Sequence, residues 1–128
     1  MTITTTPDHQ SRILHTVSRG TVTLQQIEHY QNTVWLEPSI YGYNELYDVT
    51  KSDYSSISFS ELIGISQTAS HLYMIDPNSR FAFLTATQNH IELAEFYMAA
   101  RSLSKTASRE IRSFQSRSDA LEWLSSRP

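Results

Sequence analysis

The stretch RFAFLTA, Arg80 to Ala86, is a nearly continuous apolar run of strand length. A strand that is covered on both faces needs such a run, because both rows of its side chains are buried. A strand with one face in water would instead alternate apolar and polar residues. The stretch therefore predicts a strand in the interior of a parallel or mixed sheet.

Helical patterns lie on both sides of this strand. Ser58 and Glu61 have the S-x-x-E spacing of a capping box, ahead of an apolar run that we expect to be helical from Phe59 to Tyr73. A second helical pattern follows the strand, from His90 to Leu103. A strand between two helices predicts parallel pairing through right-handed crossovers.

The same alternation continues toward both ends of the chain. Residues 12–17, 46–50 and 111–114 have the length and composition of strands. Thr23 with Gln26, and Ser116 with Asp119, mark the starts of two more helices. In the first of these helices the apolar residues at 24, 27, 34 and 35 share one face, and Pro38 prevents its continuation.

The element order is therefore β(β)αβαβαβα. It predicts a single α/β domain with a mixed, mostly parallel sheet of four to five strands and about four helices. Residues 1–10 are expected to form an N-terminal edge strand or a flexible arm, and residues 11–128 the domain itself. A chain of 128 residues can bury one core of this kind.

The composition excludes several classes of protein. The chain has no cysteine, so disulfides and thiolate metal sites are absent. No apolar run approaches the roughly 20 residues that cross a bilayer, which excludes an integral membrane segment. The N-terminus lacks the basic start and apolar stretch of a signal peptide. We therefore expect a cytoplasmic protein.

Charge is distributed unevenly along the chain. Residues 1–100 hold four basic and ten acidic side chains, whereas residues 101–128 hold six basic and three acidic ones. This asymmetry predicts self-association or an acidic partner, unless it reflects no more than a solvated edge of the domain. The net charge of −3, with two lysines, argues against nucleic acid as a partner.

The motifs of the common catalytic and cofactor sites are missing. The five histidines do not form the H-x-x-x-H spacing that places two ligands on one helix face, so no metal is expected. Three scattered glycines cannot form a phosphate-binding loop, and no cofactor is expected. Gly64 and Ser66 lack the second glycine of a nucleophile elbow and fall inside a predicted helix. We assign no catalytic residue.

Several phrases of the sequence resemble one bacterial family. They are GTVTLQQIEHY, YGYNELYDVTKSD, RFAFLTAT with ELAEFYMAAR, and IRSFQSRSDALEWL. Their order and spacing, from Ile13 to Leu124, resemble the SpoIIAA-like proteins of the STAS superfamily. The resemblance implies a four- to five-stranded sheet with helices mainly on one face. It implies little about function, since a fold does not determine one.

In the anti-sigma-factor antagonists of that superfamily, a kinase phosphorylates a serine at the start of the second helix. The comparable stretch here runs from Asp53 to Ser58, without the glycine of that motif and with Tyr54 between Asp53 and the serines. The resemblance makes the following residues candidates for a phospho-acceptor or a partner contact: Ser55, Ser56, Ser58, Asp48 and Asp53. The alternative is turn and capping chemistry, with Ser58 as an N-cap.

The wider relatives of the superfamily include lipid-binding CRAL-TRIO domains. The aromatic residues Tyr43, Tyr47, Tyr54 and Tyr97 are accordingly candidates for a pocket that takes a small apolar ligand; the alternative, which we favour, is that they fill and rim the core. The function that we expect is a non-enzymatic regulatory module that binds a protein partner or itself. The alternatives are a small apolar-ligand or lipid-binding domain, and an enzyme with an unrecognised site.

Overall fold

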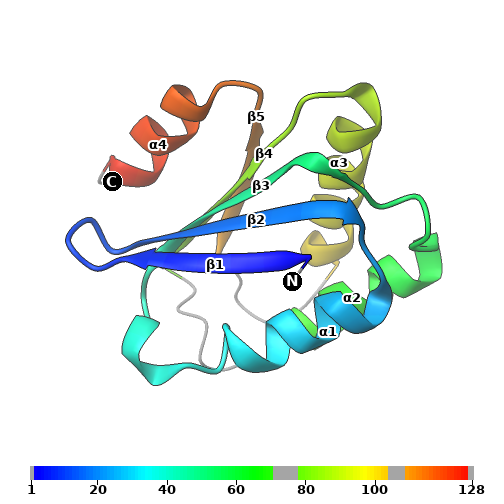
Figure 1. The fold of residues 1–128 in the computed structure, drawn as a ribbon, viewed down its shortest axis with the longest axis horizontal. Coiled ribbons are helices and arrows are strands. Elements are labelled where there is room, and N and C mark those ends of the chain that lie inside the picture. The colour runs from blue at the N-terminus through cyan, green and yellow to red at the C-terminus, as the bar shows by residue number, and fades with distance from the viewer. Residues whose placement is uncertain (1, 71–77, 104–108, 127–128) are drawn as a thin grey trace.

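A computed structural model describes residues 2–70, 78–103 and 109–126 of the chain (Figure 1). The elements follow one another in this order: β1 (Ile3–Asp8), β2 (Ile13–Thr21), α1 (Leu24–Thr33), the 3-10 turn η1 (Pro38–Ile40), β3 (Asn44–Asp53), α2 (Phe59–Ser70), β4 (Arg80–Leu84), α3 (Gln88–Ser102), β5 (Glu110–Phe114) and α4 (Arg117–Ser125). The predicted alternation of strands and helices is confirmed.

The five strands form one sheet in the order β1-β2-β3-β4-β5. β1 is antiparallel to β2, and the other three pairings are parallel. β4 lies between β3 and β5, so the apolar stretch that begins at Arg80 is an interior strand, as predicted. Of the two alternatives for the first residues, the structure has the edge strand β1.

The helices cover the two faces of the sheet unequally (Figure 1). Buried residues of α1, α2 and α3 share one core cluster with Tyr47 and Val49 of β3 and with Phe81 and Phe83 of β4. A smaller cluster on the opposite face joins α4 to the alternate residues of the same strands. Within the described residues, three helices therefore cover one face and one helix covers the other. None of the helices in the described ranges has both the length and the apolarity to cross a membrane.

Element boundaries differ from the predicted ones where local backbone geometry decides them. β2 continues past Gly20, which has a positive φ of 68°, to Thr21. α3 begins at Gln88, because Thr87 is its N-cap and His90 completes the capping box. α1 ends at Thr33, so Trp35 packs into the core from the turn that follows. The last predicted residue of the second helix, Tyr73, lies outside the described residues.

Two of the phrases that carry the family resemblance meet in space. The Arg80 side chain at the start of β4 donates to the Trp123 carbonyl (2.8 Å), and its guanidinium lies 5.0 Å from the centre of the Trp123 ring. Arg80 also donates to the carbonyl and hydroxyl of Ser126, where α4 ends. These bonds satisfy carbonyls at a helix C-terminus and attach α4 to the sheet.

Candidate functional site

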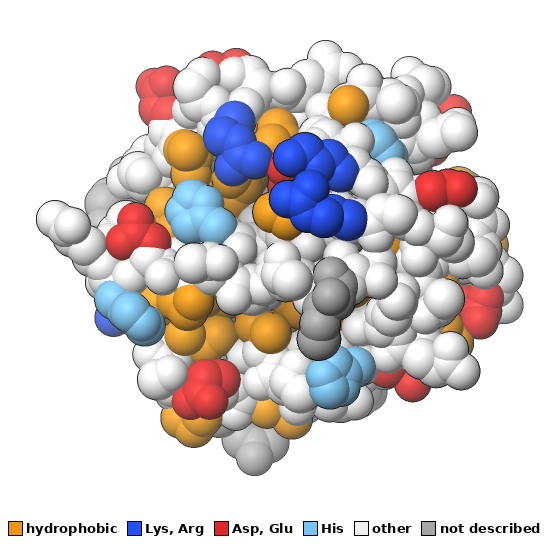
Figure 2. Space-filling model, viewed as in Figure 1, with side chains coloured by type: hydrophobic (Ala, Val, Ile, Leu, Met, Phe, Trp, Pro, Cys, Tyr) orange, Lys and Arg blue, Asp and Glu red, His pale blue; other side chains and the backbone are white. Residues whose placement is uncertain are grey.

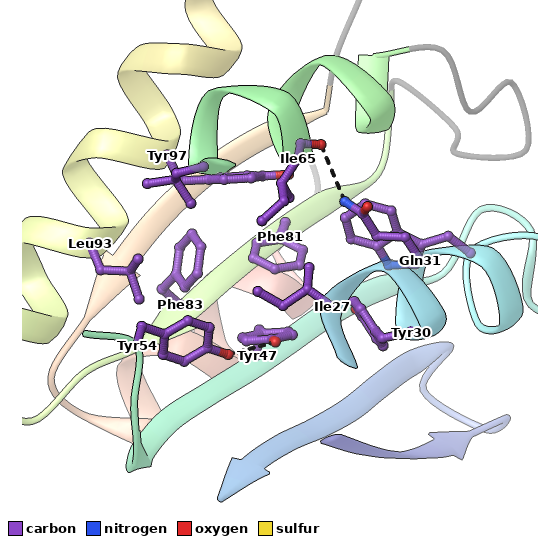
Figure 3. Close-up of a pocket in the computed structure, with 12 residues that line it drawn as sticks. Ile27, Tyr30, Gln31, Tyr47, Tyr54, Ile65, Phe81, Phe83, Leu93 and Tyr97 are labelled. Atoms are coloured by element: carbon purple, nitrogen blue, oxygen red, sulfur yellow. Dashed lines mark hydrogen bonds between the residues drawn. The ribbon is translucent and has the colours of Figure 1, made fainter. Parts of the chain in front are cut away.

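An apolar pocket lies between the sheet and the three helices of the larger core (Figure 3). Its cavity volume is about 50 Å³, and it is partly open to solvent. β3 and β4 contribute Tyr47, Phe81 and Phe83, while Ile65 of α2 and Tyr97 of α3 lie across from them. Strand alternation explains this wall, because residues two apart on β3 and β4 point to the same face.

The pocket brings together three of the four tyrosines that the sequence predicted. Tyr47, Tyr54 and Tyr97 all line it, and the hydroxyls of Tyr47 and Tyr54 are 2.7 Å apart. Tyr43 lies elsewhere, which corrects its assignment to this set. The Tyr43 hydroxyl is hydrogen-bonded to the His9 ring (2.8 Å), and the Arg12 guanidinium lies over the Tyr43 ring.

Burial shifts the ionisation of these phenols. It raises the pKa of Tyr47 well above the ordinary value of 10, with a further contribution from neighbouring Tyr54. Burial also raises the pKa of Tyr54 to about 12, although its hydrogen bond with Tyr47 acts in the opposite direction. Both phenols therefore stay protonated at physiological pH and act as hydrogen-bonding groups rather than as bases.

Replacing Tyr54 with phenylalanine should reduce the sensitivity of the fold to alkali. The unfolded chain loses the Tyr54 proton near pH 10, whereas the folded chain keeps it until about pH 12. Stability therefore falls as pH rises through this window. The variant should lose about 1 kcal/mol less than the wild type between pH 8 and pH 11. Urea unfolding at the two pH values measures the difference, and equal losses in both proteins would contradict it.

Gln31 is a polar side chain in the wall of this apolar pocket. It is 1% exposed, and its Nε2 donates to the Ile65 carbonyl over a long 3.3 Å (Figure 3). Within the described residues, Gln31 Oε1 is the one buried side-chain nitrogen or oxygen atom without a hydrogen-bond partner. A buried amide oxygen without a donor is unfavourable, so this atom needs an explanation.

A buried ion pair lies beside the pocket. Glu45 of β3 is fully buried, and its carboxylate lies 3.4 Å from Nη2 of Arg109, the residue immediately before β5. The carboxylate also accepts hydrogen bonds from the Thr16 hydroxyl (2.6 Å), the Trp35 indole (3.0 Å) and the Tyr30 hydroxyl. Four donors therefore surround one carboxylate, which is how a charge is accommodated in a core.

These polar core residues were not predicted, although the sequence contains a signal for them. Gln31 lies four residues after Ile27 and four before Trp35, on the inward face of the first helix. Glu45 precedes Tyr47 and Val49 in the alternation that faces the core. A polar residue at a position that periodicity assigns to the interior is the signal that would have identified both.

The serine segment has the capping and turn structure that was expected of it. Ser58 Oγ accepts the Glu61 amide (3.1 Å), and the Ser58 amide donates to the Glu61 carboxylate (2.9 Å), so the predicted capping box is present. Ser55 donates twice to Asp53, through its amide (2.8 Å) and its hydroxyl (3.0 Å). Ser56 donates its hydroxyl to the Val22 carbonyl (2.7 Å). Whether any of them is a phospho-acceptor or a partner contact stays a prediction.

Asp48 is held inside the chain, on the face of the sheet that α4 covers. Its side chain accepts hydrogen bonds from Thr50 and forms a 2.8 Å ion pair with Arg117 of α4. It is 4% exposed, so little of it is available to a partner. Farther along the same strands, Arg19 and Lys51 are opposite each other in the pairing of β2 with β3. Figure 2 shows Lys and Arg side chains gathered above β2, between α4 and α3.

The arginines of the basic C-terminal segment that lie in residues 101–103 and 109–126 make contacts within the domain. Arg101 donates to the Ser66 carbonyl (3.1 Å), and burial lowers its pKa. Arg109 and Arg117 pair with Glu45 and Asp48, and Arg112 pairs with Glu110. Fewer of the positive charges in this segment are therefore available to a second molecule than a count of residues implies. Among the residues that the structure describes, no three His, Asp or Glu side chains could hold a metal ion together.

An exposed aromatic pair lies next to the serine segment. Phe59 at the start of α2 is 54% exposed and Phe96 of α3 is 50% exposed. Their ring centres are 4.6 Å apart in an edge-to-face arrangement. The apolar run that predicted this helix begins at Phe59, but the Phe59 ring lies outside the core, because the N-terminus of α2 extends beyond the sheet (Figure 1).

No family model and no curated protein matches the sequence. Among solved structures, the chain is similar to the crystal structure of an uncharacterized protein of the DUF3478 family, with a SpoIIAA-like fold, from Shewanella loihica PV-4. The two superpose with a TM-score of 0.59 at 17% identity, over 95% of this chain and 91% of the other. The chain therefore has a SpoIIAA-like fold, as the resemblance implied. A likeness at this identity concerns the fold and assigns no function.

Proposed function

We propose that this SpoIIAA-like domain is a non-enzymatic module that binds a protein partner at the N-terminal end of α2. The observation that carries the proposal is the exposed pair Phe59 and Phe96. Single exposed apolar residues are normal on protein surfaces, but two aromatic rings in contact form a patch that a partner can cover. Aromatic side chains of this kind supply much of the binding energy of protein interfaces.

The charge around the pair indicates the chemistry of the partner. Residues 53–62 and 88–100 contain four carboxylates and no lysine or arginine. Hydrogen bonds from Ser55 and Ser58 lower the pKa of Asp53 and Glu61, respectively, so both carboxylates are ionised at neutral pH. A complementary surface places an apolar side chain between lysines or arginines. We therefore propose a protein partner whose binding surface has basic side chains around an apolar centre.

Phosphorylation would act on this surface through Ser55. Its hydroxyl is exposed and bonds to the exposed Asp53, whereas Ser58 Oγ caps α2 and Ser56 Oγ bonds to a backbone carbonyl. A phosphate adds a charge of about −1.5 to −2 at neutral pH. Beside Asp53 it would break the Ser55 turn by repulsion and increase the attraction for a basic partner. Ser55 is therefore the serine of the segment that we propose as a regulatory position.

Replacing Phe96 with serine should weaken the binding of such a partner by tenfold or more, because the ring lies at the centre of the proposed contact. The partner is first captured from native cell lysate on the immobilised chain and identified. Its affinity is then measured with purified proteins, at low and high salt. The affinity should fall as salt is raised, since the flanking charges are exposed.

Tyr41→Ser is the matched control, because Tyr41 is also an exposed aromatic residue, 47% exposed, but precedes β3 at the opposite end of that strand from the serine segment. It should leave the affinity unchanged, and both variants should unfold at the wild-type temperature. A captured protein that binds wild type and Phe96→Ser equally would show that this surface is not the docking site.

A further inference from the structure

We infer that the aromatic pocket is a binding site for a small, mostly apolar molecule that carries one hydrogen-bond donor. The pocket lies between the sheet and α1, α2 and α3 (Figure 3), whereas the proposed docking surface is formed by the exposed rings of Phe59 and Phe96. The inference therefore stands independently of the docking function. It rests on three properties of the pocket, which are its size, its apolar wall and the unpaired oxygen of Gln31.

The size of the pocket limits the ligand. A cavity of about 150 Å³ lined by aliphatic and aromatic residues holds benzene in a well-known engineered protein. The cavity volume here is about 50 Å³, and the pocket is partly open to solvent. A single ring can insert in part and leave its far edge in the mouth. A cavity of this volume leaves no room for the long acyl chain of a lipid.

The wall of the pocket favours a ring over a chain. Tyr47 stacks on Phe81, with ring centres 5.6 Å apart, and Phe83 makes edge-to-face contacts with Tyr97 and Tyr47. The hydroxyls of Tyr47 and Tyr54 bond to each other. Stacked and edge-to-face arrangements of this kind extend readily to one further aromatic ring.

The Gln31 amide supplies the polar feature of the site. Its Nε2 is occupied by the Ile65 carbonyl, and Oε1 has no donor among the described residues. A water molecule is a poor solution here, because an ordered buried water needs two to four polar partners and this wall is almost wholly apolar. A hydroxyl or N–H group on an apolar molecule requires one acceptor, and Gln31 Oε1 is that acceptor.

The test compares phenol with toluene, which have the same ring and differ in the donor. Nitrogen-15 NMR of the full chain follows the side-chain amide of Gln31, identified by its absence in Gln31→Leu. We expect phenol to bind the wild type about tenfold more tightly than toluene, the ratio that one neutral hydrogen bond provides. The Gln31 amide resonance should shift with phenol. In Gln31→Leu the preference for phenol should be lost or reversed, because the buried hydroxyl then has no acceptor.

Gln67→Leu is the matched control, since it makes the same substitution on the exposed side of α2 and should keep the tenfold preference. Gln31→Leu should also unfold at a higher temperature than the wild type, because it removes an unpaired buried acceptor. Binding of neither molecule to the wild type, or equal binding of both, would overturn the inference. Displacement of phenol by oleate would overturn the size limit. None of these three results bears on the Phe96 experiment, which tests the docking surface.

Discussion

Replacing Arg109 with leucine is expected to lower the free energy of unfolding by about 3–5 kcal/mol, because it leaves a buried carboxylate without its cation. Glu45 is 0% exposed and Arg109 is 7% exposed, so water cannot take the place of the missing guanidinium. The substitution also removes a cation–π contact, since the guanidinium lies 4.9 Å from the Trp35 ring centre and 4.7 Å from that of Phe81. Urea unfolding at pH 7 measures the loss.

The double variant Glu45→Gln with Arg109→Leu separates the charge from the packing. Glutamine keeps one acceptor oxygen, enough for the hydroxyls of Tyr30 and Thr16, which bond to the same carboxylate oxygen of Glu45, while both buried charges are removed. The double variant should therefore be more stable than Arg109→Leu alone, although it carries one more substitution. The single variant Glu45→Gln provides the reference. If Glu45→Gln lowers the free energy of unfolding by the same amount in Arg109→Leu as in the wild type, the two side chains do not interact, and the ion pair is not what stabilises this core.

Replacing Phe81 with alanine should lower the free energy of unfolding by a similar amount, about 3–5 kcal/mol. Phe81 lies on the interior strand β4, is 3% exposed and packs against Tyr47, Trp35 and Phe83. Its ring also supports the guanidinium of Arg109. Truncation leaves a void that the sheet cannot close, because β4 is hydrogen-bonded on both sides. Thermal and urea unfolding both report the change.

Two variants set the scale for this measurement. Phe81→Leu retains most of the buried volume and should lose a smaller part of the stability. Phe96→Ala removes a ring of the same size from a half-exposed position and should change stability by no more than about 0.5 kcal/mol. Equal losses at Phe81 and Phe96 would mean that the interior position of β4 is not the source of the effect.

Much of the fold was predictable because its signals are local. The capping boxes at Thr23 and Ser58 and the apolar stretch after Arg80 each express the preference of a few neighbouring residues. Once the order of elements is known, the right-handed crossover rule leaves few topologies. The parallel sheet and its interior β4 follow from these signals alone.

The candidate sites were predictable in part. The tyrosines of the pocket were identified by residue type, and three of four converge, because Tyr47, Tyr54 and Tyr97 lie on elements that face one core. Tyr43 did not, since it precedes β3 and meets His9 from the β1–β2 turn instead. The exposure of Phe59 was not predictable from helical periodicity, which cannot tell how far a helix extends beyond the sheet that it covers.

By itself the sequence determined the order of the elements, the interior strand and the helix starts, because each depends on residues within a few positions of one another. Tertiary structure alone decided which charges are buried, which rings are exposed and where a pocket is left. The reason is that these properties arise between distant residues, such as Glu45 and Arg109, which meet only when β3 and β5 join one sheet. Contacts between residues so far apart have no characteristic spacing in the sequence, so they could not be predicted from it.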